Sequence, residues 1–223
     1  MSQALAEEQK EGAMSPASTW EPFAAEVLKI YESAPATEQS MAEILRPLMH
    51  MLYNRVVEDE QFRNQLLQCP DSAGSGSPTW SSTLYESETI RAGLLSVYRD
   101  KPVPFHDHPG AIGITLVLSG VARIEYANFV SNNDNNGLVK LKTSRARERL
   151  PGQVCWFFEH DRNIHSVEAG TPNTVLLVIH MPHVDTEKQS LYFPVADEER
   201  EEGEVFMAHR VKAKRHHADA DYV

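Results

Sequence analysis

A succession of short apolar segments between Trp80 and Met181 constrains the fold of this chain more than any other feature. Turn-forming stretches such as Ser119-Gly120 and the Asn-rich tract 131–137 separate the segments. Apolar runs with this punctuation are typical of β-strands joined by tight turns. The expected strands cover residues 80–85, 90–98, 112–118, 121–126, 138–142, 154–158 and 174–181. So many short strands in succession predict a mainly β domain, built as a sandwich or a double-sheet barrel.

The chain before this region has a different periodicity. Between Trp20 and Gln68, apolar residues recur three or four positions apart, which is the spacing of amphipathic helices. A stretch rich in Gly, Ser and Pro then separates the helical pattern from the strand pattern. We therefore expect a disordered tail over residues 1–18, a helical lead-in over 19–70, a linker over 71–79, a barrel over 80–196 and a charged extension over 197–223 that begins with a peripheral strand or two.

The acidic composition narrows the class of partner. With 21 Lys and Arg against 32 Asp and Glu, the formal net charge at pH 7 is −11. A surface of this sign repels phosphate backbones and anionic headgroups, so we expect no nucleic acid and no membrane as partner. Because the sequence lacks a long apolar run and a hydrophobic leader, we expect a cytoplasmic protein. Two cysteines, Cys69 and Cys155, are too few for a disulfide scaffold.

Two histidines separated by one residue carry the strongest chemical signal. His106 and His108 lie in the segment Pro104-Phe-His-Asp-His-Pro-Gly110. Alternate residues of a strand face the same side, about 6.6 Å apart along it, so both imidazoles can bind one metal ion. A further ligand must come from another strand, and His165 in Asn163-Ile-His-Ser166 is the natural candidate. The sequence therefore predicts a metal site formed by His106, His108 and His165.

Two alternatives stay open at this point. A His-x-His pair taken alone is a surface accident about as often as it is a ligand pair. In addition, His160 lies in a loop-like stretch shortly before His165 and is a second candidate for the third ligand.

The residues around the first two histidines resemble those of the cupin family. The first cupin motif consists of His-x-His, four residues, Glu, six residues and Gly. Here four residues follow His108, then Gly113, then six residues and Gly120, so glycine replaces the carboxylate ligand. Three histidines without that glutamate resemble the thiol dioxygenase branch of the cupins. HDHPG, together with the stretch Asn163–Ala169, is most similar to cysteamine dioxygenases and plant cysteine oxidases, and more distantly to cysteine dioxygenase.

This resemblance implies a cupin jelly-roll β-barrel that follows the α-helical N-terminal segment and holds one Fe(II) ion. It also implies an enzyme that converts a small thiol and O₂ to a sulfinate, the thiol being cysteamine, cysteine or an N-terminal cysteine. Three imidazoles leave coordination positions open for the thiolate and O₂, although they also accept zinc, nickel or manganese. We expect a glutamate introduced at Gly113 to occupy one of these positions and to lower thiol oxidation.

The resemblance also indicates two candidate catalytic residues. His180 lies on the last apolar strand, where cysteine and mercaptopropionate dioxygenases have the histidine of a Ser-x-His-x-Tyr triad; the serine and the tyrosine are absent here. Tyr192 resembles an aromatic residue near the end of the cysteamine dioxygenase domain. A purely structural role, in hydrogen bonding for His180 and in core packing for Tyr192, remains the alternative for each.

The substrate is less well defined by the sequence. Enzymes for free cysteine grip its carboxylate with an arginine on an early strand, and the segment 80–86 contains none. Glu86 and Glu88 can attract an amine, whereas Arg91 and Arg99 are candidate carboxylate clamps; the balance favours an aminothiol or an N-terminal cysteine. Two other functions stay open: a three-histidine cupin dioxygenase of another substrate such as 3-mercaptopropionate, and a non-catalytic cupin that senses a metal or a ligand.

Overall fold

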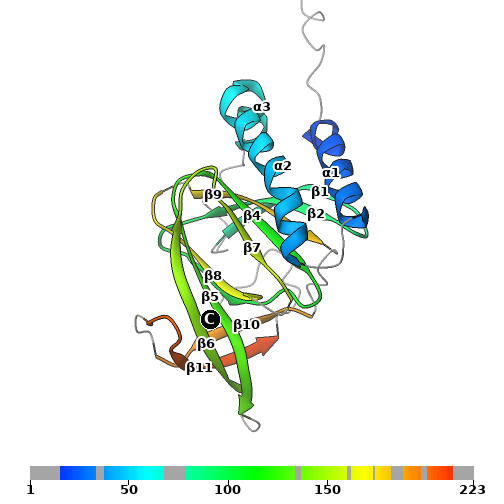
Figure 1. Ribbon diagram of the computed structural model, residues 1–223. Helices are drawn as coiled ribbons and strands as arrows, with labels where there is room; N and C mark the ends of the chain where they lie inside the picture. The colour runs from blue at the N-terminus through cyan, green and yellow to red at the C-terminus, as the bar shows by residue number, and fades with distance from the viewer. Residues whose placement is uncertain are drawn as a thin grey trace, which may run out of the picture.

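The computed structural model describes residues 16–33, 38–67, 79–133, 137–159, 162–172, 174–181, 188–196 and 200–212. Within these ranges the chain forms helices first and strands afterwards (Figure 1). Most of the expected tail and linker, at 1–15 and 71–78, lies outside the described residues, as does the end of the chain from 213 to 223. The prediction of a mainly β chain with a helical N-terminal segment is confirmed.

Three helices precede the sheet, and the first two of them pack against one of its faces. They are α1 (Pro16–Ser33), α2 (Glu38–Glu58) and α3 (Glu60–Leu67). The apolar stripe of α2 consists of residues at intervals of three or four, which places them on one side of the helix, and all of them are buried: Leu45, Met49, Leu52 and Val56. This stripe packs against strands β4 and β7, while α1 packs against β1 (Figure 1). Within the described ranges, none of the helices combines the length and apolarity needed to cross a bilayer.

The sheet beneath the helices has five antiparallel strands in the order β1-β2-β9-β4-β7. These strands are β1 (Thr79–Glu86), β2 (Arg91–Val97), β9 (Thr174–Met181), β4 (Ile112–Ser119) and β7 (Val154–Phe157). The central strands β4 and β9 are buried over most of their length, as expected for strands covered on both faces.

A closed barrel of six strands forms the second layer, in the order β10-β11-β6-β5-β8-β3. These strands are β10 (Ser190–Pro194), β11 (Val205–Lys212), β6 (Leu138–Arg149), β5 (Ala122–Asn133), β8 (Ile164–Ala169) and β3 (Val103–His106). Side chains from both layers, including Val117, Ile124 and Leu176, form a buried apolar cluster between them. The barrel and the sheet therefore enclose a common core, and the metal-binding candidates lie at its border.

The strand β11 falls in the segment expected as a charged extension. It pairs with β10 on one side and with β6 on the other, so it completes the barrel. Only Ala208 is fully buried on this strand, and the outer positions Val205 and Val211 are exposed. A strand with so few buried side chains shows little apolar periodicity in the sequence. Its pairing depends on residues far away in the chain.

Candidate metal centre

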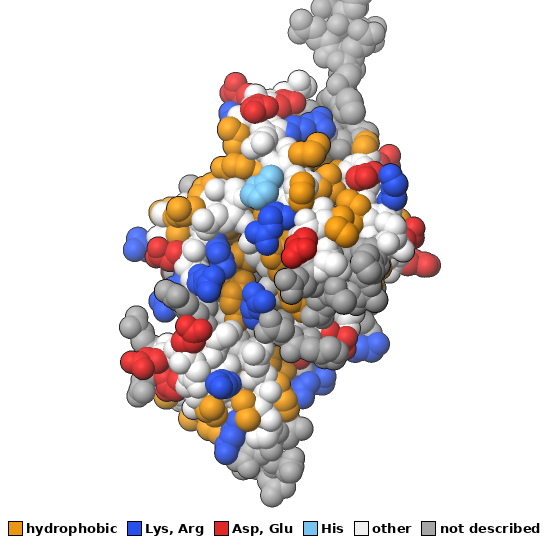
Figure 2. Space-filling model, in the orientation of Figure 1, with side chains coloured by type: hydrophobic (Ala, Val, Ile, Leu, Met, Phe, Trp, Pro, Cys, Tyr) orange, Lys and Arg blue, Asp and Glu red, His pale blue; other side chains and the backbone are white. Residues whose placement is uncertain are grey.

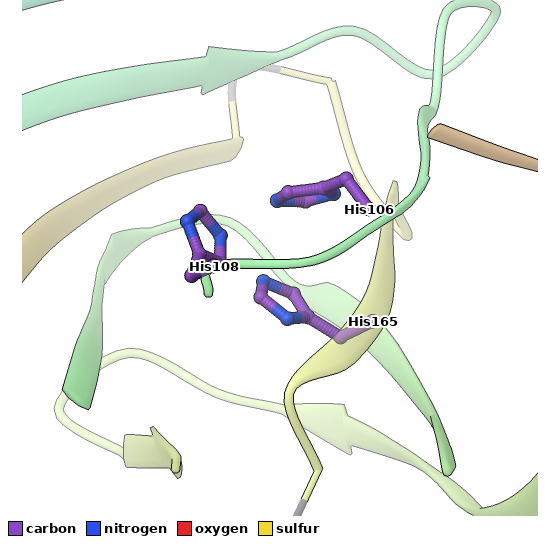
Figure 3. A group of neighbouring side chains, drawn as sticks. All are labelled: His106, His108 and His165. Atoms are coloured by element: carbon purple, nitrogen blue, oxygen red, sulfur yellow. The ribbon is translucent and has the colours of Figure 1, made fainter. Parts of the chain in front are cut away.

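The three predicted ligands come together on the strands of the barrel. His106 is the last residue of β3, and it lies directly opposite His165 of the neighbouring strand β8. His108 follows two residues after His106, at the start of the connection to β4. One ring nitrogen from each histidine lies within 4.8 Å of the others, and Figure 3 shows the three rings turned toward a common point. The arrangement offers a metal ion three imidazole ligands on one side.

Hydrogen bonds from the outer ring nitrogens orient these imidazoles. The Nδ1 of His106 lies 2.9 Å from the Pro104 carbonyl oxygen, and the Nδ1 of His165 lies 3.3 Å from that of Asn163. When Nδ1–H donates to a carbonyl, the proton is fixed on that nitrogen and Nε2 keeps its lone pair for a metal. Two of the three imidazoles are therefore held by the backbone in the tautomer that binds a metal through Nε2.

The third imidazole has a side-chain partner. The amide nitrogen of Gln189 lies 2.9 Å from Nδ1 of His108. A rotation of the amide by half a turn brings its oxygen to the same place, where it accepts a hydrogen bond from Nδ1–H. That orientation is the one that leaves Nε2 of His108 free for a metal. No sequence motif indicated Gln189, because the contact joins residues 81 positions apart.

Burial keeps the three imidazoles uncharged. Removal from water lowers the pKa of His106, and it lowers the pKa of His108 and His165 well below the ordinary value of 6.5. Neighbouring imidazoles lower the pKa of the last two further, since two charged rings would repel each other. The neutral ring is the form that binds a metal, so the site is ready for a cation at neutral pH.

A buried aspartate anchors the turn that carries the His-x-His pair. The two carboxylate oxygens of Asp107 accept hydrogen bonds from the Ser190 backbone N–H at 2.6 Å and from the Tyr192 hydroxyl at 2.8 Å. On the other side of the turn, the backbone N–H of His108 donates to the Asn163 side chain at 2.7 Å. Burial and the Asp107 carboxylate raise the pKa of Tyr192, so its hydroxyl keeps the proton that it donates. Tyr192 thus contacts the site through Asp107.

An aromatic ring fills the place that the missing glutamate would need. Gly113 on β4 lies opposite Phe157 on β7, and a Cβ atom added to Gly113 would lie 1.6 Å from that ring. The Phe157 ring stacks on the imidazole of His108 and packs at a tilt against that of His165, with centroids 4.8 Å and 4.4 Å away. A glutamate at position 113 must therefore displace Phe157 before it can approach a metal. In the sequence, Phe157 is one residue of the apolar run 154–158, and nothing in that run indicates this contact.

A cavity of about 230 Å³ opens beside the three imidazoles. Its other walls include Arg91, Leu94, Thr115, Leu176, Val178 and His180. The ring of the candidate catalytic residue His180 has its centroid 4.4 Å from that of His108. Tyr192 instead lines a second cavity, together with Asp107 and Arg210.

The other sequence candidates lie elsewhere. Glu86 and Glu88 are exposed, and neither is among the described residues that line the cavity beside the imidazoles. Arg99 is exposed as well and does not belong to that set, whereas Arg91 does. His160, the alternative third ligand, lies outside the described residues.

A cupin-like β-barrel with three convergent imidazoles, two on strands β3 and β8 and one in the turn after β3, defines a candidate three-histidine metal centre. The PCO_ADO family model matches residues 28–220 of the sequence. The chain therefore belongs to the PCO_ADO family of cysteine/cysteamine dioxygenases.

Solved structures similar to this chain share little of its sequence. KdgF from Halomonas sp. is 14% identical over 48% of this chain and 82% of that chain, with a TM-score of 0.38. A conserved protein with a double-stranded β-helix domain from Klebsiella pneumoniae is 14% identical over 55% and 84%, with a TM-score of 0.40. The cupin domain of Schizosaccharomyces pombe Cnp3 is 13% identical over 48% and 66%, with a TM-score of 0.37. No curated protein matches the chain.

Proposed function

We propose that this protein is a non-haem Fe(II) thiol dioxygenase, which converts a small thiol and O₂ to a sulfinate. The observation that carries the proposal is the set of three neutral imidazoles, two buried and one half-buried, at one point of the barrel, where a phenyl ring fills the place of a carboxylate ligand. Membership in a family of thiol dioxygenases supports the same conclusion.

The reaction balances without any further reductant. The thiol sulfur gives up four electrons, O₂ accepts four, and both oxygen atoms remain in the sulfinate. Fe(II), when bound, supplies coordination positions for the thiolate and O₂ and lowers the pKa of the thiol. His106, His108 and His165 would hold the ion, and the apolar walls formed by Leu176 and Val178 would keep bulk water from the sulfur.

Two further residues receive distinct roles in this proposal. The His180 ring lies in the cavity wall beside His108, so it is placed to accept the proton that a thiol loses on binding. Tyr192 is a positioning residue, since its hydroxyl holds the Asp107 carboxylate in the turn between two ligands.

Oxygen uptake tests the proposal directly. Iron-loaded protein is supplied with cysteamine, L-cysteine, 3-mercaptopropionate or a peptide that begins with cysteine, and the sulfinate is identified by mass spectrometry. We expect O₂ consumption matched by sulfinate with at least one thiol, and loss of both in His165→Ala. The control is His50→Ala, which removes an exposed histidine on α2. Stoichiometric iron binding without oxidation of any thiol would overturn the proposal and indicate a non-catalytic metal- or ligand-binding cupin.

A further inference from the structure

Asn163 contacts two of the three candidate metal ligands at once. Its side-chain oxygen Oδ1 accepts a hydrogen bond from the backbone N–H of His108 at 2.7 Å, and its carbonyl oxygen lies 3.3 Å from Nδ1 of His165. His108 lies in the turn after β3, whereas Asn163 directly precedes β8. Asn163 therefore joins the turn that carries the His-x-His pair to the strand that carries the third imidazole.

The two contacts constrain different movements of the ligands. The hydrogen bond to the His108 backbone fixes where the turn lies relative to β8, and the contact with Nδ1 of His165 fixes the rotation of that ring. The two imidazoles stack with their centroids 5.2 Å apart (Figure 3). A metal ion requires both constraints, because the distances from a metal to its imidazole nitrogens vary by only about 0.2 Å.

The backbone before Asn163 is held in an unusual conformation. Arg162 has a φ of 59°, which lies in the left-handed region that residues with a side chain rarely adopt. Its backbone N–H donates to the side-chain oxygen of Asn128 at 3.0 Å. Asn128 follows Ala127 on β5, and Ala127 pairs with Ile164, the first residue of β8. Strand β5 thereby holds the chain in the conformation that presents the Asn163 carbonyl to His165.

An asparagine side chain supplies both partners that this position requires. The amide oxygen of Asn163 accepts from the His108 backbone, and its amide nitrogen donates to the Glu159 carbonyl oxygen at 3.3 Å. A backbone N–H can only donate, so this contact defines which end of the amide faces His108. Aspartate in this position would keep the acceptor and lose the donor, whereas alanine would lose both.

We propose that Asn163 is a positioning residue that sets the geometry of the metal centre. Asn128 supports it by holding Arg162 in the left-handed conformation. Without the Asn163 side chain, the His-x-His turn and β8 are no longer tied to each other, so the three ring nitrogens meet one ion less well. The inference rests on the metal binding in the function proposed above, and it does not depend on which thiol is oxidised.

Cobalt(II) is a suitable probe, because imidazoles bind it and its visible absorption bands report the coordination geometry. We expect Asn163→Ala to lower the Co(II) affinity about 10–100-fold and to change the absorption bands of the saturated protein. Asn128→Ala should have a smaller effect in the same direction. Asn163→Asp keeps the acceptor for the His108 N–H, so it should recover most of the affinity and the wild-type spectrum.

The control is Asn54→Ala, which changes an exposed asparagine on α2. Urea unfolding of the metal-free proteins defines conditions in which every variant is folded, and the titrations are made there. A wild-type affinity and spectrum in folded Asn163→Ala would overturn the inference, whatever the rate of thiol oxidation. The expected losses support it even if the wild type oxidises no thiol, in which case only the proposed dioxygenase function fails.

Discussion

At the scale of single residues, Phe157 determines how much room the metal centre offers. Its ring packs against two of the three imidazoles and lies against the backbone of Gly113. The Phe157 ring can therefore take this position only because Gly113 has no side chain. The ring occupies the space through which a side chain at position 113 would have to approach the three candidate ligands.

Because positions 113 and 157 depend on each other, a double-mutant cycle is informative. Gly113→Ala should destabilise the metal-free protein by about 1–3 kcal/mol, because the new methyl group collides with the Phe157 ring. In a Phe157→Ala background the same change should cost much less, since the colliding ring is gone. Urea unfolding of the four proteins gives the coupling free energy. An equal cost of Gly113→Ala in both backgrounds would contradict the described packing.

Gln189 is the second residue whose role rests on one contact. Gln189→Leu removes the hydrogen-bond partner of Nδ1 of His108, and we expect the Fe(II) affinity to fall about 10–100-fold. Competition with a coloured Fe(II) chelator under anaerobic conditions measures the change. Gln153→Leu, which alters an exposed glutamine in the turn before β7, should leave the affinity unchanged. Identical affinities in the two variants would count against this role for Gln189.

The residues of the site differ in how visible they are in the sequence. The His-x-His pair indicates a ligand pair because its geometry is local, and His165 follows as the histidine on a later strand. Phe157 and Gln189 have no such signal, since their positions depend on the pairing of β4 with β7 and on a contact across 81 residues. Arg91 was a candidate in the sequence, but its place beside His180 depends on the register of β2 against β9.

At the scale of elements, the short strand β3 and the strand β10 hold the ligand turn together. They pair through Phe105 and His106, and the Asp107 carboxylate adds hydrogen bonds to two residues of β10. Arg210 on the next strand, β11, donates to the Ser190 hydroxyl and lies 4.0 Å from the same carboxylate. Three strands thus fix a turn whose two flanking residues are candidate metal ligands.

Tyr192→Phe tests whether the Tyr192 hydroxyl has a structural or a catalytic role. Loss of the hydroxyl leaves one Asp107 oxygen without its partner, and we expect the free energy of unfolding to fall by about 1–3 kcal/mol. The kcat of the iron-saturated enzyme should stay within about twofold, because a positioning residue is not needed once the site is formed. His180→Gln should instead lower kcat while stability changes little. A large loss of kcat in fully loaded, folded Tyr192→Phe would show that the hydroxyl takes part in the reaction.

The strands of the large sheet are easier to predict than β10 and β11. Strands β4 and β9 are buried over most of their length, so their apolar runs stand out in the sequence. In contrast, β11 is mostly exposed and contains polar and charged residues such as His209 and Arg210. Its place in the barrel follows from backbone pairing with β6 and β10, which leaves no trace in side-chain periodicity.

At the scale of the whole molecule, the helices and the site lie on opposite faces of one sheet. The α2 stripe, with Leu45 and Met49, packs on the face of β4 and β7 away from the imidazoles. Acidic and basic side chains are interspersed over the surface seen in Figure 2, so the net charge of −11 does not gather into one patch on that face.

The stability of the whole chain should depend on pH through the three imidazoles. In the folded protein, the pKa values of these imidazoles are lowered below 6.5. At any pH between 6.5 and the lowered pKa values, the unfolded chain therefore binds protons that the folded chain does not. The metal-free protein should be most stable above about pH 6.5, and then lose about 1.4 kcal/mol per pH unit for each neutral imidazole as the pH falls.

Urea unfolding at about pH 7.5, 6.5 and 5.5 measures this dependence. In His108→Ala one buried imidazole is absent, so the slope below pH 6.5 should be smaller than in the wild type. A wild-type stability that is the same at all three values would contradict the burial of uncharged rings.

The pairing of His106 with His165 also bears on how the protein is made. The two residues belong to strands that are neighbours in the barrel, but His165 is synthesised long after His106. A growing chain holds the His-x-His pair alone, and two imidazoles on a flexible segment bind iron weakly. The third ligand arrives only when β8 docks beside β3. Under the proposed function, redox-active iron would therefore be retained only by the finished barrel and not by incomplete chains.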